Sequence, residues 1–164
     1  MDVRRYDPSR DEGSLWGLKE DFERELGGLG GGGKAETYDG KLTEGYRERY
    51  LDWVEWCIEH DPDCIAVADP AERGNELAGY VFVLPGELSM IWDAAVVNEL
   101  YVDEAHRGTG LVDDLLDAAF ACVEGQDLPL DRVALDVDPD NGPANGVYRR
   151  HGFEPWGDLL MREH

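Results

Sequence analysis

The sequence predicts an α/β fold in which helices flank a mixed, mostly antiparallel central sheet. Two segments with apolar residues at helical spacing fill most of the first 60 positions, and three runs rich in β-branched and aromatic residues follow. The last third of the chain alternates strand and helix patterns, which implies a parallel pair of strands there. With 164 residues the chain is long enough for one core, so we expect a single domain over residues 1–164.

The first 60 residues contain one short strand pattern and two helix patterns. Val3 to Tyr6 can form an opening strand, and Glu12 to Leu26 carries leucine and phenylalanine at helical spacing with acidic residues between them. A second helix is predicted from about Thr43 to His60, with Thr43 as its N-cap. These two helices lie within about residues 12–60.

The middle of the chain predicts three consecutive antiparallel strands. They cover Cys64–Ala68, Leu77–Leu84 and Ala94–Val102, and the turn-rich stretch Asp69–Asn75 separates the first two. Together with the segments that follow, to about residue 155, they form the predicted core of the sheet.

The remaining residues predict the alternating part of the fold. A helix starts at Leu111 and ends near Gly125, with apolar residues on one face and aspartates on the other. The elements predicted after it are a strand over Arg132–Val137, a short helix over Pro143–His151 and a last strand near Asp158–Met161.

The composition restricts the class of partner. The 37 acidic and 15 basic residues give a formal net charge of −22, and only three of the basic residues are lysines. Such a surface argues against nucleic-acid binding, and no apolar run approaches the roughly 20 residues that span a bilayer. This composition, with many acidic residues and few lysines, resembles that of cytoplasmic proteins of halophiles. We therefore expect a cytoplasmic location and a fold that loosens when salt is removed.

Cysteine and histidine give no metal-binding pattern. Cys57, Cys64 and Cys122 have no C-x-x-C spacing, and their odd number favours buried, reduced thiols. The four histidines are scattered, without ligand spacing. We expect no metal site.

The glycine run of residues 27–33, followed by Lys34, satisfies two phosphate-binding patterns at once. G-x-G-x-x-G and G-x-x-x-x-G-K both fit, but the run follows a helix instead of a strand, and Ala35 replaces the hydroxyl residue that would bind Mg²⁺. Adjacent glycines match almost any glycine pattern by chance. The run is therefore interpreted as a mobile connection between the first two predicted helices, with no further helix expected between the run and about Leu42.

A less conspicuous glycine motif lies between the predicted strand Ala94–Val102 and the helix that starts at Leu111. Arg107-Gly-Thr-Gly110 forms a polar turn, and the first N–H groups of the following helix lack partners within the helix. Such a helix start suits a pyrophosphate, to which Arg107 can add a charged contact. A strand-to-helix turn also uses glycine for purely structural reasons, so the motif alone leaves both interpretations open.

A second motif, in residues 141–153, favours the functional interpretation. Arg107-x-x-Gly110-x-Val112 resembles the R/Q-x-x-G-x-G/A motif of the GCN5-related N-acetyltransferase family, except at its last position. Residues 141–153 fit the family's N-x-x-A-x-x-x-Y-x-x-x-G-F at each specified position, namely Asn141, Ala144, Tyr148, Gly152 and Phe153. The resemblance covers residues 60 to 155 well and the first 60 in outline. It implies an acetyl-CoA-binding core over about residues 64–155 and an acceptor side formed by the helices within about residues 12–60. The glycine run of residues 27–33 would overhang the entrance for the acceptor.

The resemblance implies an acetyl-CoA site between two parallel strands that separate from each other. The pantetheine arm would pair with the main chain of the strand that ends at Leu100, Tyr101 and Val102. The pyrophosphate would lie on the main-chain amides of Arg107, Gly108, Thr109, Gly110, Leu111 and Val112. Val112 replaces the family's usual Gly or Ala, so we expect some crowding at the phosphates.

The resemblance also suggests how an amine would be acetylated. Tyr148 matches the family tyrosine that protonates the leaving thiolate, and its alternative is a packing role. Asn141 either binds the cofactor or caps a helix. Glu99 is the candidate base, as a lone carboxylate in an apolar run, unless it faces solvent or neutralises an arginine; Asp93 is the second candidate. Strand alternation places Glu99 on the face of Val97 and Tyr101 unless a bulge intervenes.

Two other functions compete with an acetyl-CoA-dependent N-acetyltransferase. One is a non-catalytic acyl-CoA-binding module of the same fold, and the other is a nucleotide-binding protein that uses the glycine run. The sequence leaves open whether the acceptor is a small amine or a protein amine, and whether the chain forms a homodimer.

Overall fold

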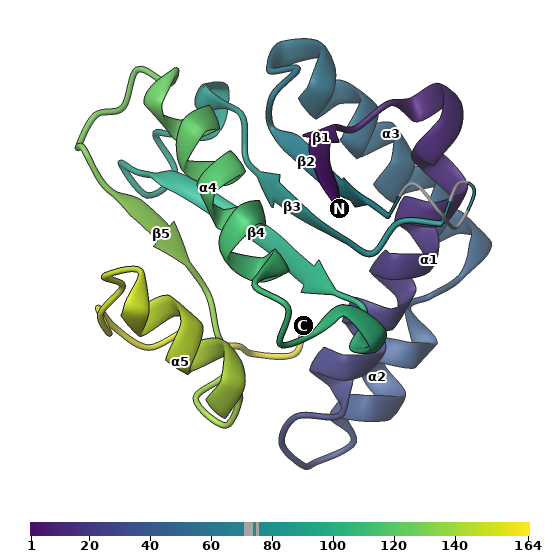
Figure 1. Cartoon of the computed structure of the whole chain (residues 1–164). Helices are drawn as coiled ribbons and strands as arrows, with labels where there is room; N and C mark the ends of the chain where they lie inside the picture. Colours follow the sequence, from purple (N-terminus) through teal and green to yellow (C-terminus); the bar gives the residue numbers. More distant parts are fainter. Residues whose placement is uncertain (71–73, 75) are drawn as a thin grey trace.

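The computed structural model describes residues 1–70, 74 and 76–164. These residues form one five-stranded sheet in the order β1-β2-β3-β4-β5 (Figure 1). The first four strands pair antiparallel, and β4 pairs parallel with β5. The strands are β1 (Asp2–Arg5), β2 (Ile65–Asp69), β3 (Gly79–Val83), β4 (Ala95–Val102) and β5 (Val133–Leu135). The predicted antiparallel order and the predicted parallel pair are both confirmed.

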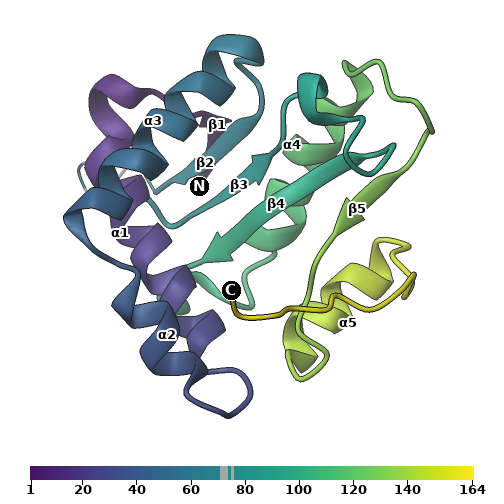
Figure 2. The same cartoon turned by 180° about the vertical axis from the view of Figure 1, so that it is seen from behind.

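Helices cover both faces of this sheet. They are α1 (Pro8–Gly27), α2 (Lys34–Gly40), α3 (Glu44–His60), α4 (Leu111–Glu124) and α5 (Gly142–Arg150), with short 3₁₀ turns at Gly86–Leu88 and Glu104–His106. α4 packs on one face, and α1 and α3 lie on the other (Figures 1 and 2). α5 docks toward α4, where His151 lies 2.6 Å from an oxygen of Asp113. None of the helices in the described ranges is long and apolar enough to cross a membrane.

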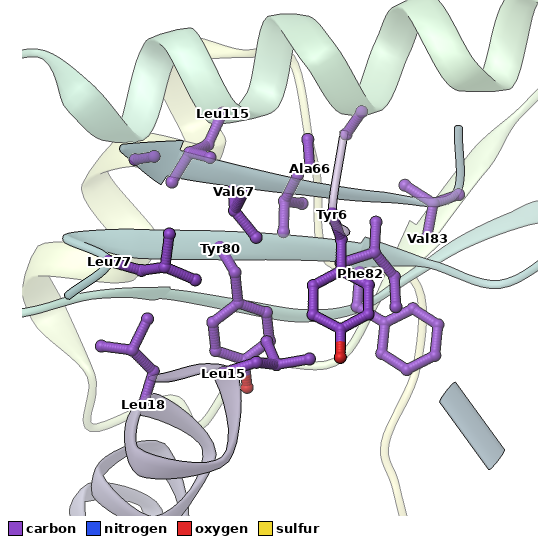
Figure 3. Close-up of a cluster of buried hydrophobic side chains, with 14 of the residues drawn as sticks. Tyr6, Leu15, Leu18, Ala66, Val67, Leu77, Tyr80, Phe82, Val83 and Leu115 are labelled. Carbon is purple, nitrogen blue, oxygen red and sulfur yellow. The ribbon is translucent and has the colours of Figure 1, made fainter. Parts of the chain in front are cut away.

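The core is concentrated around the two central strands. β3 is buried at each of its five positions, because helices cover it on both faces. Figure 3 shows Tyr80 and Phe82 pointing from β3 toward the helix that carries Leu15 and Leu18, whereas Leu115 packs from the opposite side. The two faces therefore hold different kinds of side chain, with large aromatic rings beneath α1 and α3.

Several local predictions are confirmed in detail. Thr43 caps α3 through a hydrogen bond that its hydroxyl accepts from the Tyr46 N–H at 3.2 Å. Cys57, Cys64 and Cys122 are free and buried, and burial raises the pKa of each thiol. Thiols with raised pKa values stay protonated at neutral pH and are therefore weak nucleophiles.

The sequence predicted no helix between the glycine run and Leu42. This prediction is wrong, because α2 occupies Lys34–Gly40. Gly33 precedes it in the left-handed conformation (φ 78°), which a glycine adopts without strain. The helix is only seven residues long, too short for an apolar period to be visible. It packs on α1, so tertiary contact stabilises what the local pattern does not encode.

The predicted last strand at Asp158–Met161 is also wrong, since the described residues 153–164 form no helix or strand. Leu160 and Met161 are largely exposed there, at 87% and 83%. Apolar residues of this kind form a strand only when another strand offers them a partner, and β5 is itself only three residues long. The predicted turn at residues 69–75 falls largely on 71–73 and 75, which lie outside the described residues.

Candidate active site

The candidate site lies where β4 and β5 separate. The two strands pair only from Ala95 to Val97 and from Val133 to Leu135, and β4 then continues for five residues beyond the last pair. Figure 2 shows the strands diverging toward their C-terminal ends, with α5 beside the wider end. Main-chain groups along the last part of β4 are therefore free of a strand on that side, as the predicted pairing with a pantetheine arm requires.

At the end of β4 the chain turns into α4 through two left-handed glycines. Gly108 has φ 72° and Gly110 has φ 86°, and Gly110 is the N-cap residue of α4. Within the described chain, no recorded main-chain hydrogen bond uses the N–H groups of residues 108–112, whereas the Asp113 and Asp114 N–H groups bond to the Gly110 carbonyl. Unpaired N–H groups at the start of a 14-residue helix form a favourable anion site.

Neighbouring side chains fix the shape of this turn. The Thr109 hydroxyl donates to the His106 carbonyl at 2.6 Å, and Asp103 accepts from the His106 N–H at 3.1 Å. Leu111 is buried, and Val112 is half-buried and packed against the core. The β-branched side chain of Val112 therefore contacts the core.

Arg107 is directed away from the turn that it precedes. Its Nε donates to the Val102 carbonyl at 3.0 Å, and a terminal nitrogen donates to Glu25 of α1 at 2.6 Å. The guanidinium lies 5.5 Å from the Tyr101 ring centroid, and its bond to Glu25 raises the pKa of Arg107. These residues border an open hollow of about 640 Å³ whose lining also includes Asp21, Arg24, Asp103, Glu104 and Ala105. In this structure Arg107 connects α1 to β4.

The second sequence motif forms α5 beside the gap. Asn141 is the N-cap residue, and its side-chain oxygen accepts from the Ala144 N–H at 3.3 Å, so the structure shows the capping role. Tyr148 is half-buried and packs edge-on against Phe153, with ring centroids 5.8 Å apart. Burial raises the pKa of Tyr148 to about 12, so its phenol is protonated at neutral pH.

A bulge in β4 decides which way Glu99 points. Phe82 pairs with Glu99, but the next residue, Val83, pairs with Val97, so Asn98 is an extra residue on β4. Residues paired across neighbouring strands share a face, so Glu99 lies on the face of Tyr101 and opposite to that of Val97. Simple alternation is correct for Tyr101 and wrong for Val97.

The bulge places Glu99 against the helices α1 and α3. Glu99 is 4% exposed, and both its oxygens have protein partners. Oε2 forms an ion pair with the ammonium of Lys19 from α1, and Oε1 accepts from the Tyr50 hydroxyl of α3 at 2.7 Å. The charged partner of Glu99 is thus a lysine. From the sequence, an ion pair with an arginine was one alternative to a catalytic role for Glu99.

Lys19 and Tyr50 are the residues that sequence reasoning missed. One signal was available for Lys19, because Glu23 follows at i+4 and only three lysines occur in the chain. Asp93, the second candidate base, lies in the exposed turn before β4, at the opposite end of that strand from Val102. The geometry thus brings Glu99, and not Asp93, to the part of β4 that precedes the turn at residues 107–110.

The glycine run connects α1 to α2, and the residue after it reaches across the molecule. Lys34 Nζ lies 3.0 Å from an oxygen of Asp138, which belongs to the connection between β5 and α5. The Asp140 N–H and Lys34 lower the pKa of Asp138. The run is therefore attached at its end to the same region that carries Asn141. No group of metal-binding side chains occurs within the described ranges.

These features are those of a known family. The model of the Acetyltransferase (GNAT) family matches residues 34–153, which is 120 of the 164 residues. The chain therefore belongs to this family. The matched region begins at α2 and includes both the turn at residues 107–110 and α5.

A curated relative is the "Putative [ribosomal protein bS18]-alanine N-acetyltransferase" of Bacillus subtilis, which is 28% identical over 86 residues. The match covers 52% of this chain and 52% of the relative, so the chain spans about half the length of the curated relative.

Solved structures share the fold at low sequence identity. The PaiA N-acetyltransferase of Thermoplasma acidophilum in complex with coenzyme A has a TM-score of 0.70 at 16% identity, covering 93% of this chain and 89% of that one. PH1933 of Pyrococcus horikoshii gives 0.63 at 18%, covering 97% and 92%. The aminoglycoside N-acetyltransferase AAC(6')-Iy with CoA gives 0.60 at 15%, covering 99% and 98%.

Proposed function

We propose that the chain is an acetyl-CoA-dependent N-acetyltransferase that acetylates a primary amine. The observation that carries the proposal is the set of free N–H groups at residues 108–112, placed beside the gap where β4 and β5 separate. Membership in the GNAT family supports it. The curated relative's name specifies an alanine of a ribosomal protein, so a protein α-amine is one candidate acceptor.

Acetyl-CoA would bind along the end of β4 and over the start of α4. Main-chain groups of Leu100, Tyr101 and Val102 would pair with the pantetheine arm, and the amides from Arg107 through Gly108, Thr109, Gly110 and Leu111 to Val112 would hold the pyrophosphate. Asn141 would support the site by fixing the start of α5.

Two side chains would perform proton transfer. Glu99 would accept the proton that the acceptor nitrogen loses, and Tyr148 would donate to the departing thiolate. The raised pKa of Tyr148 keeps its proton available at neutral pH. Asp93 remains the less favoured base, because its position in the turn before β4 is remote from the phosphate turn.

The proposal also extends to the setting of the enzyme. A single acetyltransferase domain over residues 1–164 and a cytoplasmic location fit the continuous sheet and the halophile-like composition. The net charge of −22 disfavours nucleic acid and anionic membrane surfaces as partners. A homodimer is compatible with the exposed apolar residues of the C-terminal segment.

The test combines thiol release from acetyl-CoA across a panel of amines with calorimetric binding of acetyl-CoA. We expect Tyr148→Phe to lower kcat by about 10²-fold or more with little change in acetyl-CoA affinity. Tyr6→Phe is the matched control, because Tyr6 is a buried tyrosine beside β1 at the other edge of the sheet.

Each outcome separates the candidate functions. Binding without thiol release for any amine would identify the non-catalytic acyl-CoA-binding module, for which the fully engaged oxygens of Glu99 are the structural argument. Protection of the fold by ATP and not by acetyl-CoA would instead support the nucleotide-binding alternative.

A further inference from the structure

The helix that carries Tyr148 is attached to the rest of the fold through few side chains. α5 lies at the edge of the molecule (Figures 1 and 2), and none of its nine residues is fully buried. Within the described chain, the recorded polar side-chain contacts from α5 and its C-cap residue His151 to another helix or strand all go to Asp113 of α4. The position of α5 therefore depends strongly on contacts near its C-terminal end.

The Asp113 carboxylate accepts from two side chains at the end of α5. His151 Nε2 lies 2.6 Å from Asp113 Oδ1, and a terminal nitrogen of Arg150 lies 3.1 Å from the same oxygen and 3.4 Å from the other. The bonds from His151 and Arg150 lower the pKa of Asp113, so the carboxylate is ionised at neutral pH. A carboxylate only accepts hydrogen bonds, so Nε2 carries the proton of this contact whether the imidazole is neutral or charged.

The residues that contact α4 also hold Tyr148. The Tyr148 carbonyl accepts from the His151 N–H at 3.1 Å and from the Phe153 N–H at 3.0 Å. Gly152 between them has φ 85°, a conformation that glycine adopts without strain. The Phe153 ring packs against that of Tyr148, and Phe120 of α4 has its ring centroid 6.2 Å from that of Phe153 and 6.0 Å from that of His151. Tyr148 is thus connected to α4 through His151 and Phe153.

Asp113 is itself joined to the turn at residues 107–110. Its N–H donates to the Gly110 carbonyl at 3.0 Å, and it directly follows the free N–H groups of residues 108–112. A carboxylate in the first turn of a helix interacts favourably with the helix dipole, which keeps an ionised Asp113 stable at this end of α4. Asp113 therefore links the turn proposed to hold the pyrophosphate to the helix that carries the proposed acid.

We propose that Asp113 is a positioning residue, which through His151 and Arg150 holds the Tyr148 phenol in place to protonate the departing thiolate. The inference rests on the proposed function, with Tyr148 as the acid. As the C–S bond breaks, its electron pair stays on sulfur, the proton moves from the Tyr148 oxygen to that sulfur, and water returns a proton to the tyrosinate. Proton transfer requires hydrogen-bond distance, so a small displacement of α5 lowers the rate without removing any amide that would bind acetyl-CoA.

The first test separates kcat from cofactor affinity. In Asp113→Asn, kcat for thiol release should fall about 10-fold, because α5 loses its ionic contact and the phenol is displaced. The dissociation constant for acetyl-CoA, measured by calorimetry, should stay equal or decrease, since a negative charge near the proposed phosphate position is removed. Asp114→Asn is the matched control, because Asp114 is the next residue of the same turn, is exposed and has no recorded side-chain partner in the described chain. It removes the same charge and should leave kcat within about 2-fold.

The second test is a double-variant cycle, which shows whether Asp113 acts through Tyr148. In the Tyr148→Phe background the phenol is absent, so adding Asp113→Asn should lower kcat by less than about 2-fold more. A decrease of about 10-fold in both backgrounds would overturn the proposal, because Asp113 would then act independently of Tyr148. His151→Gln keeps a donor nitrogen for the carboxylate and should retain most of kcat, whereas His151→Leu should resemble Asp113→Asn.

Amide hydrogen exchange gives a readout that does not depend on turnover. Asp113→Asn should speed up exchange of the α5 amides, and Asp114→Asn should not. Unchanged exchange in a folded Asp113→Asn protein would overturn the inference alone, because thiol release and its dependence on Tyr148 would persist. Absence of thiol release with every amine in the unmodified protein would instead refute the proposed function, and the exchange rates would still decide whether Asp113 holds α5. If Asp113→Asn does not fold, the two His151 variants test the same link from the other side.

Discussion

Replacing Lys19 by methionine should destabilise the fold more than replacing either of the other two lysines. The change leaves Glu99 and Glu23, both less than 5% exposed, without their shared counter-ion. Removing one partner of a buried ion pair costs about 3–5 kcal/mol, which is a large part of the roughly 5–15 kcal/mol that folded domains possess. For a chain of this size the loss corresponds to a decrease of about 10 °C in the thermal midpoint.

The assay is urea unfolding at constant KCl, followed by circular dichroism. Lys34→Met is the control, because Lys34 pairs with Asp138 near the surface with 29% of its side chain exposed, and such pairs contribute about 0–1 kcal/mol. The double variant Lys19→Met/Glu99→Gln removes both charges and should recover part of the loss. If Lys19→Met lowers the free energy of unfolding by no more than Lys34→Met does, the assignment of a buried, energetically coupled cluster is wrong.

Three further predictions concern the turn, the surface and the pH range. Gly110→Ala should lower the free energy of unfolding by about 1 kcal/mol and weaken acetyl-CoA binding, because Gly110 has φ 86°. Gly17→Ala within α1, where a methyl group meets no atom, should instead raise the free energy of unfolding by about 0.5–1 kcal/mol. Urea unfolding measures the stability of both variants and calorimetry their acetyl-CoA binding, and equal effects would contradict the reasoning. The thermal midpoint should rise between dilute buffer and multimolar KCl, because salt screens the net charge of −22, and a constant midpoint would refute the halophilic interpretation. The free energy of unfolding should fall above about pH 10, because the pKa values of Lys19, Tyr50 and Tyr80 are raised in the folded protein. The unfolded chain releases these protons at lower pH than the folded chain does, so stability present below about pH 10 is lost as the pH rises. A free energy of unfolding that is flat from about pH 9 to 11 would disprove this prediction.

The order of elements and the position of the glycine turn at residues 107–110 could be predicted from the sequence, because both are local properties. Apolar periodicity identifies α1, α3 and α4, and alternation with β-branched residues identifies β2 to β4. The glycines at 108 and 110 mark a left-handed turn whatever surrounds them. Only two elements were misjudged: α2, which depends on packing against α1, and a final strand that lacks a partner.

The surroundings of Glu99 were decided by the tertiary structure. The bulge at Asn98 turns Glu99 toward α1 and α3, and register is a property of two strands together. Lys19 meets Glu99 across 80 positions of the chain, and Arg107 meets Glu25 across 82. No period or motif relates residues so far apart. The sequence by itself determined the fold class, the family resemblance and the turn at which the phosphates are proposed to bind. Only the folded chain determined that the candidate base already has an ammonium beside it, because burial and pairing of charges exist only after distant segments have packed together.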